Sequence, residues 1–346
     1  MSDWAPAIEA AALAVSRASA VCRAVQARLD DVRSILKDDK SPVTVADFAS
    51  QAVVAWTLRE TMGSCVMVGE EDAHELREQL SAGERTTVDQ VVEAARLVWT
   101  DATVDDVLDA IDLGNADPRA HGAYWTLDPI DGTKGFLRDQ QYAVALGWIE
   151  GGLVTLGALG CPNLSLDQSF PVSEKDGRGS LYLATRGGGV REVACDEPDR
   201  TGRPIGRSAR GTADPVRMCE SAEAGHTSHG AAGEVLSRVT GELGTTAGEP
   251  ARLDSQAKYA VVARGQADLY LRLPRPGKPY VERIWDHAAG SLVASEAGCA
   301  VSDASGTALD FGHGAGLERN AGVVVGDPAV HGPAIEAIGS LGAARA

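Results

Sequence analysis

The apolar positions of the first 36 residues follow a helical spacing. Residues 5–36 are rich in alanine, and their apolar side chains recur three or four positions apart, which predicts one long amphipathic helix. The segment 40–47 contains Pro42 and predicts a break after that helix. Asp47 is then placed to cap a second helix that continues through Trp56 and Leu58.

Short apolar runs predict strands over the next part of the chain. Residues 142–150 and 153–160 flank Gly151-Gly152, which favours a tight hairpin and an antiparallel sheet. A short buried strand is expected at 65–68 and a strand pair within 181–193, between loops at 163–180 and 196–216. Residues 73–120 read as helix and loop, with the acidic patch 101–112 as a solvated face.

From about residue 217 onward, strands and helices alternate. Strands are expected at 217–221, 251–253 and 267–273, and helices at 230–241, 255–264 and 286–298. We therefore expect a layered α/β protein, with an α+β first half built on an antiparallel sheet and an α/β second half. The expected domains are residues 1–160 and residues 161–346.

Composition narrows the class of protein. The chain has 346 residues, 44% of them hydrophobic, which is enough for two domains or one large layered domain. Its formal net charge of -17 argues against binding to nucleic acid or to an anionic membrane surface by bulk electrostatics. An anionic substrate would need local metals or arginines.

Cysteine spacing and the start of the chain point to a reducing compartment. The six cysteines contain no C-x-x-C pair, so neither a zinc knuckle nor a disulfide framework is indicated. The chain starts without the basic and apolar regions of a secretory leader, and no run approaches roughly 18 consecutive apolar residues. We expect a cytoplasmic protein, and the sequence leaves monomer and dimer equally open.

The segment Asp128-Pro129-Ile130-Asp131-Gly132-Thr133 carries the strongest chemical signal. Pro129 fixes its own φ and biases Asp128 toward an extended backbone, while Asp131-Gly132 favours a turn, so both carboxylates should project from one bend. The plain alternative is an acidic surface turn that caps a helix. The apolar flanks favour a buried turn instead, and a buried carboxylate pair needs a cation. The N-H groups after Gly132 and Thr133 would suit a phosphate.

Other charged residues stand at the ends of predicted elements. Three acids, Glu70-Glu71-Asp72, follow the strand at 65–68, and one of them is a candidate metal ligand. Asp286 lies at the start of a predicted helix, where stabilisation by the helix dipole alone would explain it, and His287 reads as a structural histidine. Lys258 and Arg272 could form an anion clamp, although an arginine in a strand usually marks an exposed face.

Eight segments together resemble one family. They are SPVTVAD, VGEED, WTLDPIDGTKGFLR, AGHTSH, LDSQAKY, YLRLP, IWDHAAG and LDFGHG, and they span residues from about 35 to about 325. The chain resembles the bisphosphate nucleotidase branch of the inositol monophosphatase superfamily, which consists of magnesium-dependent, lithium-sensitive phosphatases. D-P-I-D-G-T and W-D-H-A-A-G carry the resemblance to the superfamily, and G-F-L-R, D-S-Q-A-K-Y and Y-L-R-L-P carry the resemblance to the branch. The resemblance implies the inositol monophosphatase-like sugar phosphatase fold. It also implies that residues 1–160 form a metal-binding domain and residues 161–346 a nucleotide-binding domain, with the active site between them.

The resemblance also implies roles for individual residues. Two to three Mg²⁺ ions would be held by Glu70, Asp128, the carbonyl of Ile130, Asp131 and Asp286, all of them hard oxygen ligands. Asp47 and Thr133 would polarise the attacking water, with Glu71 as a helper behind the ligands, so the resemblance weakens the cap interpretation of Asp47. Gly132 and Thr133 would meet the phosphate. The nucleotide would contact His226, Ser255, Lys258 and Arg272, the last two at its 5'-phosphate.

The chain departs from the family pattern at two places. Gly230-Ala231-Ala232 follow His229 where the family has acidic and glutamine residues, and Ala315 replaces an arginine after L-D-F-G-x-G. Both changes bear on base and sugar specificity and leave the catalytic set intact.

The leading hypothesis is removal of the 3' (or 2') phosphate from an adenosine bisphosphate, a by-product of sulfate activation. An inositol polyphosphate 1-phosphatase, or a phosphatase of a modified nucleoside phosphate, would use the same chemistry. A non-catalytic nucleotide-binding protein of the same fold is the alternative from another class, and it would not need to keep every metal carboxylate.

Overall fold

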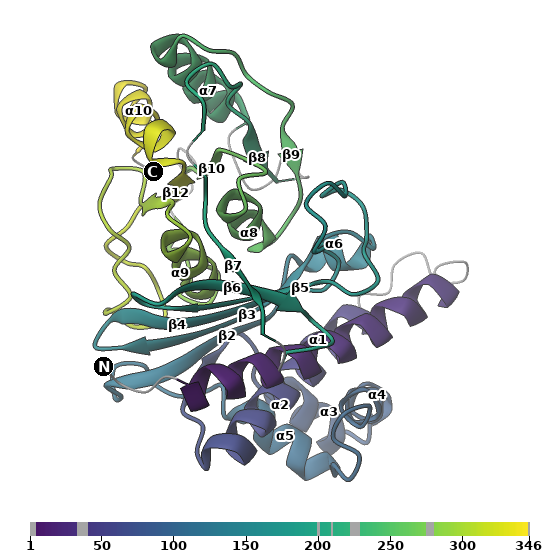
Figure 1. The fold of residues 1–346 in the computed structure, drawn as a ribbon. Coiled ribbons are helices and arrows are strands. Elements are labelled where there is room, and N and C mark those ends of the chain that lie inside the picture. Colours follow the sequence, from purple (N-terminus) through teal and green to yellow (C-terminus); the bar gives the residue numbers. More distant parts are fainter. Residues whose placement is uncertain are drawn as a thin grey trace.

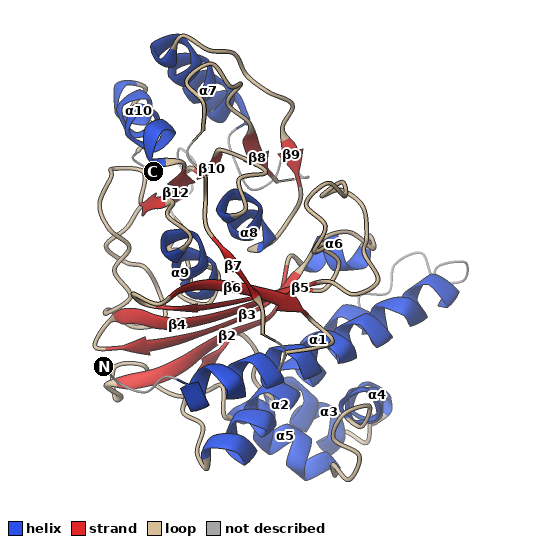
Figure 2. Cartoon of the chain, in the orientation of Figure 1, coloured by secondary structure: helices blue, strands red, loops and turns tan. Residues whose placement is uncertain are grey.

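The computed structural model describes residues 5–32, 41–198, 201–208, 210–221, 229–274 and 280–344, without the side chains of 29–32, 41–43 and 229. His226 therefore lies outside the described residues. Figures 1 and 2 show two sheets, with helices on the outer face of each sheet and between them. The protein is thus a layered α/β protein, as the sequence predicts.

The first sheet has seven strands in the order β1-β2-β3-β4-β5-β6-β7. They are Met67–Gly69 (β1), Ala123–Asp131 (β2), Ala143–Glu150 (β3), Leu153–Cys161 (β4), Ser180–Thr185 (β5), Gly189–Ala194 (β6) and Arg203–Ile205 (β7). β1 pairs with β2 in parallel, and all the other neighbours in this sheet are antiparallel. Gly151 and Gly152 have positive φ in the turn between β3 and β4, which suits the tight hairpin that the sequence predicts.

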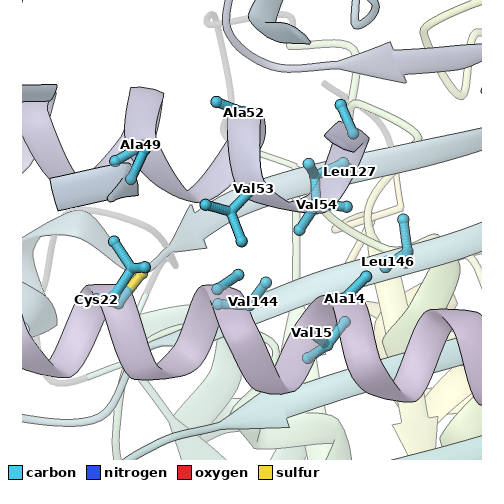
Figure 3. Packing of buried hydrophobic residues seen from close by; sticks show 14 of the residues in the cluster. Ala14, Val15, Cys22, Ala49, Ala52, Val53, Val54, Leu127, Val144 and Leu146 are labelled. Atoms are coloured by element: carbon cyan, nitrogen blue, oxygen red, sulfur yellow. The ribbon is translucent and has the colours of Figure 1, made fainter. Parts of the chain in front are cut away.

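Five helices from the first part of the chain cover the outer side of this sheet. They are α1 (Ala5–Val32), α2 (Ser41–Met62), α3 (His74–Ser81), α4 (Thr86–Ala95) and α5 (Val104–Asp112). α1 contacts β3, β4 and β5, while α2 contacts β2. Figure 3 shows Val15 and Cys22 of α1 and Val53 of α2 in the same apolar layer as Val144. The acidic residues of α5 lie on its exposed face, where Asp109 and Asp112 pair with Arg77.

The start of α2 corrects one expectation. The helix begins at Ser41, so Asp47 lies in its second turn and does not cap it. Pro42 fits there because an N-H group in the first helical turn would have no acceptor within the helix. The fixed φ of proline is also already helical. The segment 41–47 is therefore helix, not the break that we expected from its proline.

Helix α1 also has the length and composition of a membrane span. Its segment Ala5–Arg28 is the only one among the described residues that is long and apolar enough, and 67% of its most apolar window is buried in the protein. The contacts of α1 with β3, β4 and β5 account for this apolar surface as core packing.

The second sheet has five strands in the order β11-β12-β10-β8-β9. They are Met218–Glu220 (β8), Ala251–Arg252 (β9), Leu269–Arg272 (β10), Ala300–Ser302 (β11) and Val323–Gly326 (β12). The remaining helices are α6 (Thr133–Leu137), α7 (His229–Leu243), α8 (Ala257–Ala263), α9 (Ala288–Glu296) and α10 (Pro328–Ser340). Helices α8 and α9 lie between the two sheets, and α7 and α10 cover the far side of the second (Figure 1).

The first sheet extends beyond the domain limit that we placed at residue 160. Strands β5 to β7 join it through β4, so the change from one sheet to the other falls between Ile205 and Met218. One apolar cluster contains Ala145 of β3, Val293 of α9 and Val325 of β12, and so joins both sheets. The division into a metal-binding and a nucleotide-binding domain stays a prediction.

Candidate active site

The Asp128–Thr133 motif forms the end of β2 and the start of α6. The pairing of β2 with β3 shifts register between Asp128 and Asp131, which bends the strand where both carboxylates are needed. The Asp128 carboxylate accepts a hydrogen bond from the N-H of Ile130 (3.1 Å), and the Ser50 hydroxyl of α2 donates to the Pro129 carbonyl (2.9 Å). Gly132 then adopts φ +86° and starts α6.

Parallel pairing brings Glu70 to the same place. β1 runs beside β2, with Gly69 opposite Leu127, and the N-H of Glu70 donates to the Leu127 carbonyl (3.1 Å). The residue after β1 therefore lies beside Asp128, the residue after Leu127. This confirms that a strand end aims the acids at 70–72, and it selects Glu70 as the one that reaches the motif.

The other half of the site comes from the segments that precede α8 and α9. The N-H of Gln256 donates to the Asp131 carboxylate, which joins the first residues of α8 to the motif. Ser255 adopts a φ of +73°, unusual for a residue with a side chain, and packs directly against Gly132. Asp286 lies two residues before α9, rather than in its first turn as we expected.

These segments enclose one cavity of about 280 Å³. Ten of the thirteen residues predicted for the site line it: Glu70, Asp128, Ile130, Asp131, Gly132, Thr133, Ser255, Lys258, Arg272 and Asp286. Asp47 and Glu71 do not line the cavity. Asp47 is buried, and burial, followed by the charges of Glu71 and Glu70, raises its pKa.

The carboxylates raise one another's pKa values. Burial, and then the charge of Glu70 and Asp131, raise the pKa of Asp128 well above its usual range. Burial together with Asp286 and Glu71 raises the pKa of Glu70 to about 7. Burial also raises the pKa of Asp286 to about 6, against the opposing effect of His287. Like charges gathered at this density need a cation among them.

The donor set fits a divalent, oxygen-preferring cation. Glu70, Asp128, Asp131 and Asp286 offer carboxylate oxygens, Ile130 offers a carbonyl, and none of these is a soft ligand. Burial raises the pKa of Asp131 although Lys258 and Arg272 act against this, and the pKa values of Glu70 and Asp128 are raised as well, so the described cations offset the charge of the cluster only in part.

A family model matches most of the chain. The model of the inositol monophosphatase family covers residues 3–338. The chain belongs to this family. Two fungal relatives are the 3'(2'),5'-bisphosphate nucleotidase 1 of Candida albicans, which is 39% identical over 96% of this chain and 94% of its own length, and the 3'(2'),5'-bisphosphate nucleotidase of Emericella nidulans, which is 41% identical over 88% and 90%.

Solved structures show the same fold at lower identity. The inositol monophosphatase from Anabaena has a TM-score of 0.59 and 18% identity, covering 98% of this chain and 97% of its own. SuhB of Mycobacterium tuberculosis has a TM-score of 0.59 and 19% identity, with both chains covered completely. The inositol monophosphatase fold that we expected from the sequence is confirmed.

Lys258 and Arg272, two of the cationic residues that line the cavity, differ in the contacts that they already make. Lys258 is buried, and burial lowers the pKa of its ammonium while Asp131 opposes that effect. The Arg272 guanidinium pairs with Glu282 through two contacts, Nε to Oε1 (2.8 Å) and Nη2 to Oε2 (2.7 Å), and lies 3.7 Å from Asp286. Arg272 is therefore not the exposed strand residue of the plain interpretation, and Glu282 already uses part of its charge.

His287 has a structural role, as the sequence indicates. It is fully buried, with its Nδ1 2.7 Å from the Tyr259 hydroxyl and its Nε2 3.2 Å from Glu282. Glu282, Asp286 and His287 come close enough together to hold a metal ion. The Arg272 guanidinium already neutralises Glu282, so this trio does not need one.

Sequence reasoning missed the residues that hold the site together. The Gln256 side chain donates to the Trp285 carbonyl (2.8 Å) and accepts from the N-H of Gly290 (3.0 Å), so it fixes α8 against α9. Gln51 of α2 holds the backbone of Glu71 in the same way. The ion pair between Arg138 and Asp254 (2.8 Å) joins the G-F-L-R motif to the L-D-S-Q motif. Both motifs carry the resemblance to the nucleotidase branch of the family, and their common occurrence there could have indicated this ion pair.

The segment Arg186-Gly187-Gly188-Gly189 could wrap a phosphate by its sequence, but a hairpin turn is the expected role of such a glycine run. It forms the turn between β5 and β6. The N-H groups of Gly187 and Gly189 donate to the Glu296 carboxylate of α9 (2.8 and 3.0 Å), so the anion that this turn wraps belongs to the chain itself.

Proposed function

We propose that this protein is a Mg²⁺-dependent 3'(2'),5'-bisphosphate nucleotidase, which releases the 3' (or 2') phosphate of an adenosine bisphosphate and leaves AMP. One observation carries the proposal. The carboxylate cluster and the cations Lys258 and Arg272 line the same cavity of about 280 Å³. A bisphosphate needs both groups of residues. The carboxylate cluster would serve the phosphate that is released, and the cations would hold the phosphate that is retained. The names and identities of the fungal relatives support the same activity.

The assigned metal ligands are Glu70, Asp128, Asp131, Asp286 and the carbonyl of Ile130. Bound there, Mg²⁺ would supply charge neutralisation of the phosphate and polarisation of the attacking water. The backbone geometry holds the ligands in advance, since Asp128 is fixed by the N-H of Ile130 and Asp131 by that of Gln256.

Asp47 and Thr133 are assigned as the pair that polarises the attacking water, with Thr133 at the cavity and Asp47 acting from outside its lining. Burial of Asp47 and the charges of its neighbours Glu71 and Glu70 raise its pKa, which favours proton uptake, and Glu71 helps through this charge. Thr133 is exposed to the cavity and its hydroxyl lies 3.5 Å from the Ile130 carbonyl, so it can present water beside the ligands. Helix α6 has only five residues, so Gly132 and Thr133 would meet phosphate through individual N-H groups.

Lys258 and Arg272 are assigned to the retained 5'-phosphate, and Ser255 to the sugar side of the nucleotide. Lys258 is the stronger anchor, because Arg272 shares its charge with Glu282. Tyr280 is 62% exposed at the cavity and lies 5.9 Å from the Arg272 guanidinium, where its ring offers a face to the base. Inhibition by lithium, a cytoplasmic location and a role in sulfur metabolism follow as further predictions.

A substrate panel tests the proposal. Phosphate release with Mg²⁺ is measured for adenosine 3',5'-bisphosphate, phosphoadenosine phosphosulfate, adenosine 3'-monophosphate and inositol phosphates. The bisphosphate is expected to give the highest kcat/KM. Faster turnover of an inositol phosphate would favour the polyphosphate 1-phosphatase, and absence of turnover would favour the non-catalytic alternative.

The Lys258→Met variant tests how the bisphosphate is oriented within the cavity. Loss of a charge-assisted contact should raise KM for the bisphosphate by roughly 10- to 100-fold. Adenosine 3'-monophosphate lacks the 5'-phosphate and should be nearly unaffected, so it serves as the control. Equal effects on both substrates would contradict the assigned role of Lys258.

A further inference from the structure

A second cavity, of about 540 Å³, is lined by arginines. Five of them reach it: Arg203, Arg207, Arg210, Arg217 and Arg264. Two carboxylates among the described residues, Asp214 and Asp268, line it with them. This composition is unusual for a chain with a formal net charge of -17. Like charges gathered around one hollow repel each other unless an anion lies among them.

Two of the arginines are buried and fully engaged. Arg207 pairs with Asp268 and Asp327 and also donates to the carbonyls of Val262 and Ala267. Arg264 pairs with Glu192 and donates to the Ser165 carbonyl and the Tyr182 hydroxyl. Their side chains are 3% and 1% exposed. They form the floor of the cavity, and few of their N-H groups remain available to a ligand.

The other three keep free donors at the rim. Within the described part of the chain, Arg217 donates from Nη1 to the Gln266 carbonyl (2.8 Å), and its Nε and Nη2 have no partner. Arg210 donates to the Asp214 carbonyl, while its buried Nε has no hydrogen-bond partner among the described residues. Arg203 binds Glu192 and the Leu166 carbonyl, and no described group accepts from its Nη1. A buried guanidinium N-H without a partner is costly and points to an absent acceptor.

The acidic groups around the rim do not satisfy these donors. Both oxygens of Asp268 are used, by Arg207 and by the N-H of Arg217. Asp214 is exposed and accepts from the N-H of Gly211 (2.7 Å). The unused donors are guanidinium groups, whose planar pairs of N-H bonds suit phosphate and sulfate oxygens.

The cavity lies at the opposite ends of two elements that also reach the candidate active site. Helix α8 carries Lys258 near its start and is followed directly by Arg264. Strand β10 is preceded by Asp268 and ends at Arg272. No described residue lines both cavities.

We propose that this arginine-lined cavity is a second anion site, which binds a small molecule bearing a phosphate or sulfate group. Arg210 and Arg217 supply the principal contacts, Arg203 adds one N-H group, and Arg207 and Arg264 fix the floor. The site is separate from the assigned catalytic residues and does not depend on their function.

Calorimetric titration of the full chain tests this site. Pyrophosphate is added in the presence of EDTA, at constant ionic strength set with chloride. The Lys258→Gln variant removes the strongest anion contact of the first cavity, so it is the background for the measurement. It should still bind about one equivalent of pyrophosphate, and adding Arg210→Gln and Arg217→Gln should weaken that binding by at least roughly tenfold. Parallel titrations with sulfate and with adenosine 5'-diphosphate separate a bare oxyanion from a nucleotide.

Two controls keep the outcome clear. Arg238→Gln replaces an exposed arginine of α7 that lies outside this cavity, and it should leave pyrophosphate binding unchanged. Arg217→Lys keeps the charge without the planar fork and should bind with intermediate affinity. Equal affinity with and without Arg210→Gln and Arg217→Gln would overturn the proposal, as would no binding of any of the three anions to the Lys258→Gln variant.

Discussion

The close approach of Gly132 to Ser255 decides the shape of the site at the scale of single residues. Gly132 has φ +86°, and a Cβ at this position would lie 2.7 Å from the Ser255 Cβ. No side chain fits there. The contact joins the motif that carries Asp131 to the residue before Gln256, whose N-H holds the Asp131 carboxylate.

Gly132→Ala should therefore disturb both stability and activity. The left-handed backbone costs alanine about 1–2 kcal/mol, and displacement of Ser255 should lower kcat/KM by at least roughly tenfold. Thermal unfolding and phosphate release measure the two effects. Gly177→Ala is the matched control, because nothing lies within 4 Å of its Cβ and its φ is not positive. Wild-type activity in Gly132→Ala would contradict the tight contact.

The chemical roles of single residues were easier to predict than the contacts that hold those residues in place. A carboxylate pair around a proline with apolar flanks favours a buried turn, so Asp128 and Asp131 could be proposed as site residues from the sequence. Gln51 and Gln256 act by hydrogen-bonding backbone groups that lie 20 to 60 positions away in the chain. No local sequence pattern reveals a hydrogen-bond partner that is so distant in the chain. The polar residues around Gln51 and Gln256 do not distinguish these two from surface glutamines.

At the scale of elements, predictions succeeded where the signal is local. Two glycines between apolar runs predicted the hairpin of β3 and β4. The start of α2 was misjudged because Pro42 is compatible with a first helical turn as well as with a break. The extension of the first sheet to β7 could not be predicted, since pairing of β5 with β4 is a contact across the loop from 162 to 179.

The loop that joins β11 to β12 depends on one aspartate. Burial acts against ionisation of Asp303, but hydrogen bonds from Ser305 and Asn320 outweigh it and lower the pKa of this carboxyl. The stabilisation by the carboxylate is therefore complete above the pKa of an unfolded aspartate, about 3.9, and is lost as the pH falls through the lower folded value.

Asp303→Asn should lower the free energy of unfolding by about 1–3 kcal/mol near pH 7. The difference from wild type should shrink below about pH 4, where the wild-type carboxylate itself takes up a proton. Denaturant unfolding at several pH values measures this difference. Asp101→Asn changes an exposed aspartate and should show no such dependence. A difference that stays constant from pH 7 to pH 3 would contradict the assigned role of the charge.

At the scale of the whole molecule, buried ion pairs connect the first sheet to the helices behind it. Glu192 of β6 is fully buried and pairs with Arg264, the residue that follows α8. This ion pair fixes the C-terminal end of α8, and the same helix presents Lys258 to the cavity. Both sheets and the site should therefore unfold together.

Glu192→Gln leaves the Arg264 guanidinium buried without its carboxylate. The free energy of unfolding should fall by about 3 kcal/mol, since removal of one partner from a buried pair is strongly destabilising. Glu234→Gln breaks an exposed pair with Arg238 in α7 and should cost less than about 0.5 kcal/mol. Similar small losses in both variants would show that the pair does not hold the layers together.

The measurement that tests the central claim most directly is phosphate release from adenosine 3',5'-bisphosphate as a function of Mg²⁺ concentration, for wild type and for Asp131→Asn. The variant keeps the shape of the side chain and removes one ligand charge. The wild-type rate should rise from near zero in EDTA to saturation with Mg²⁺, and the variant should still bind the nucleotide but release phosphate roughly a thousandfold more slowly. Hydrolysis by the wild type in EDTA, or equal rates for the two proteins, would contradict a metal-dependent reaction at this carboxylate cluster.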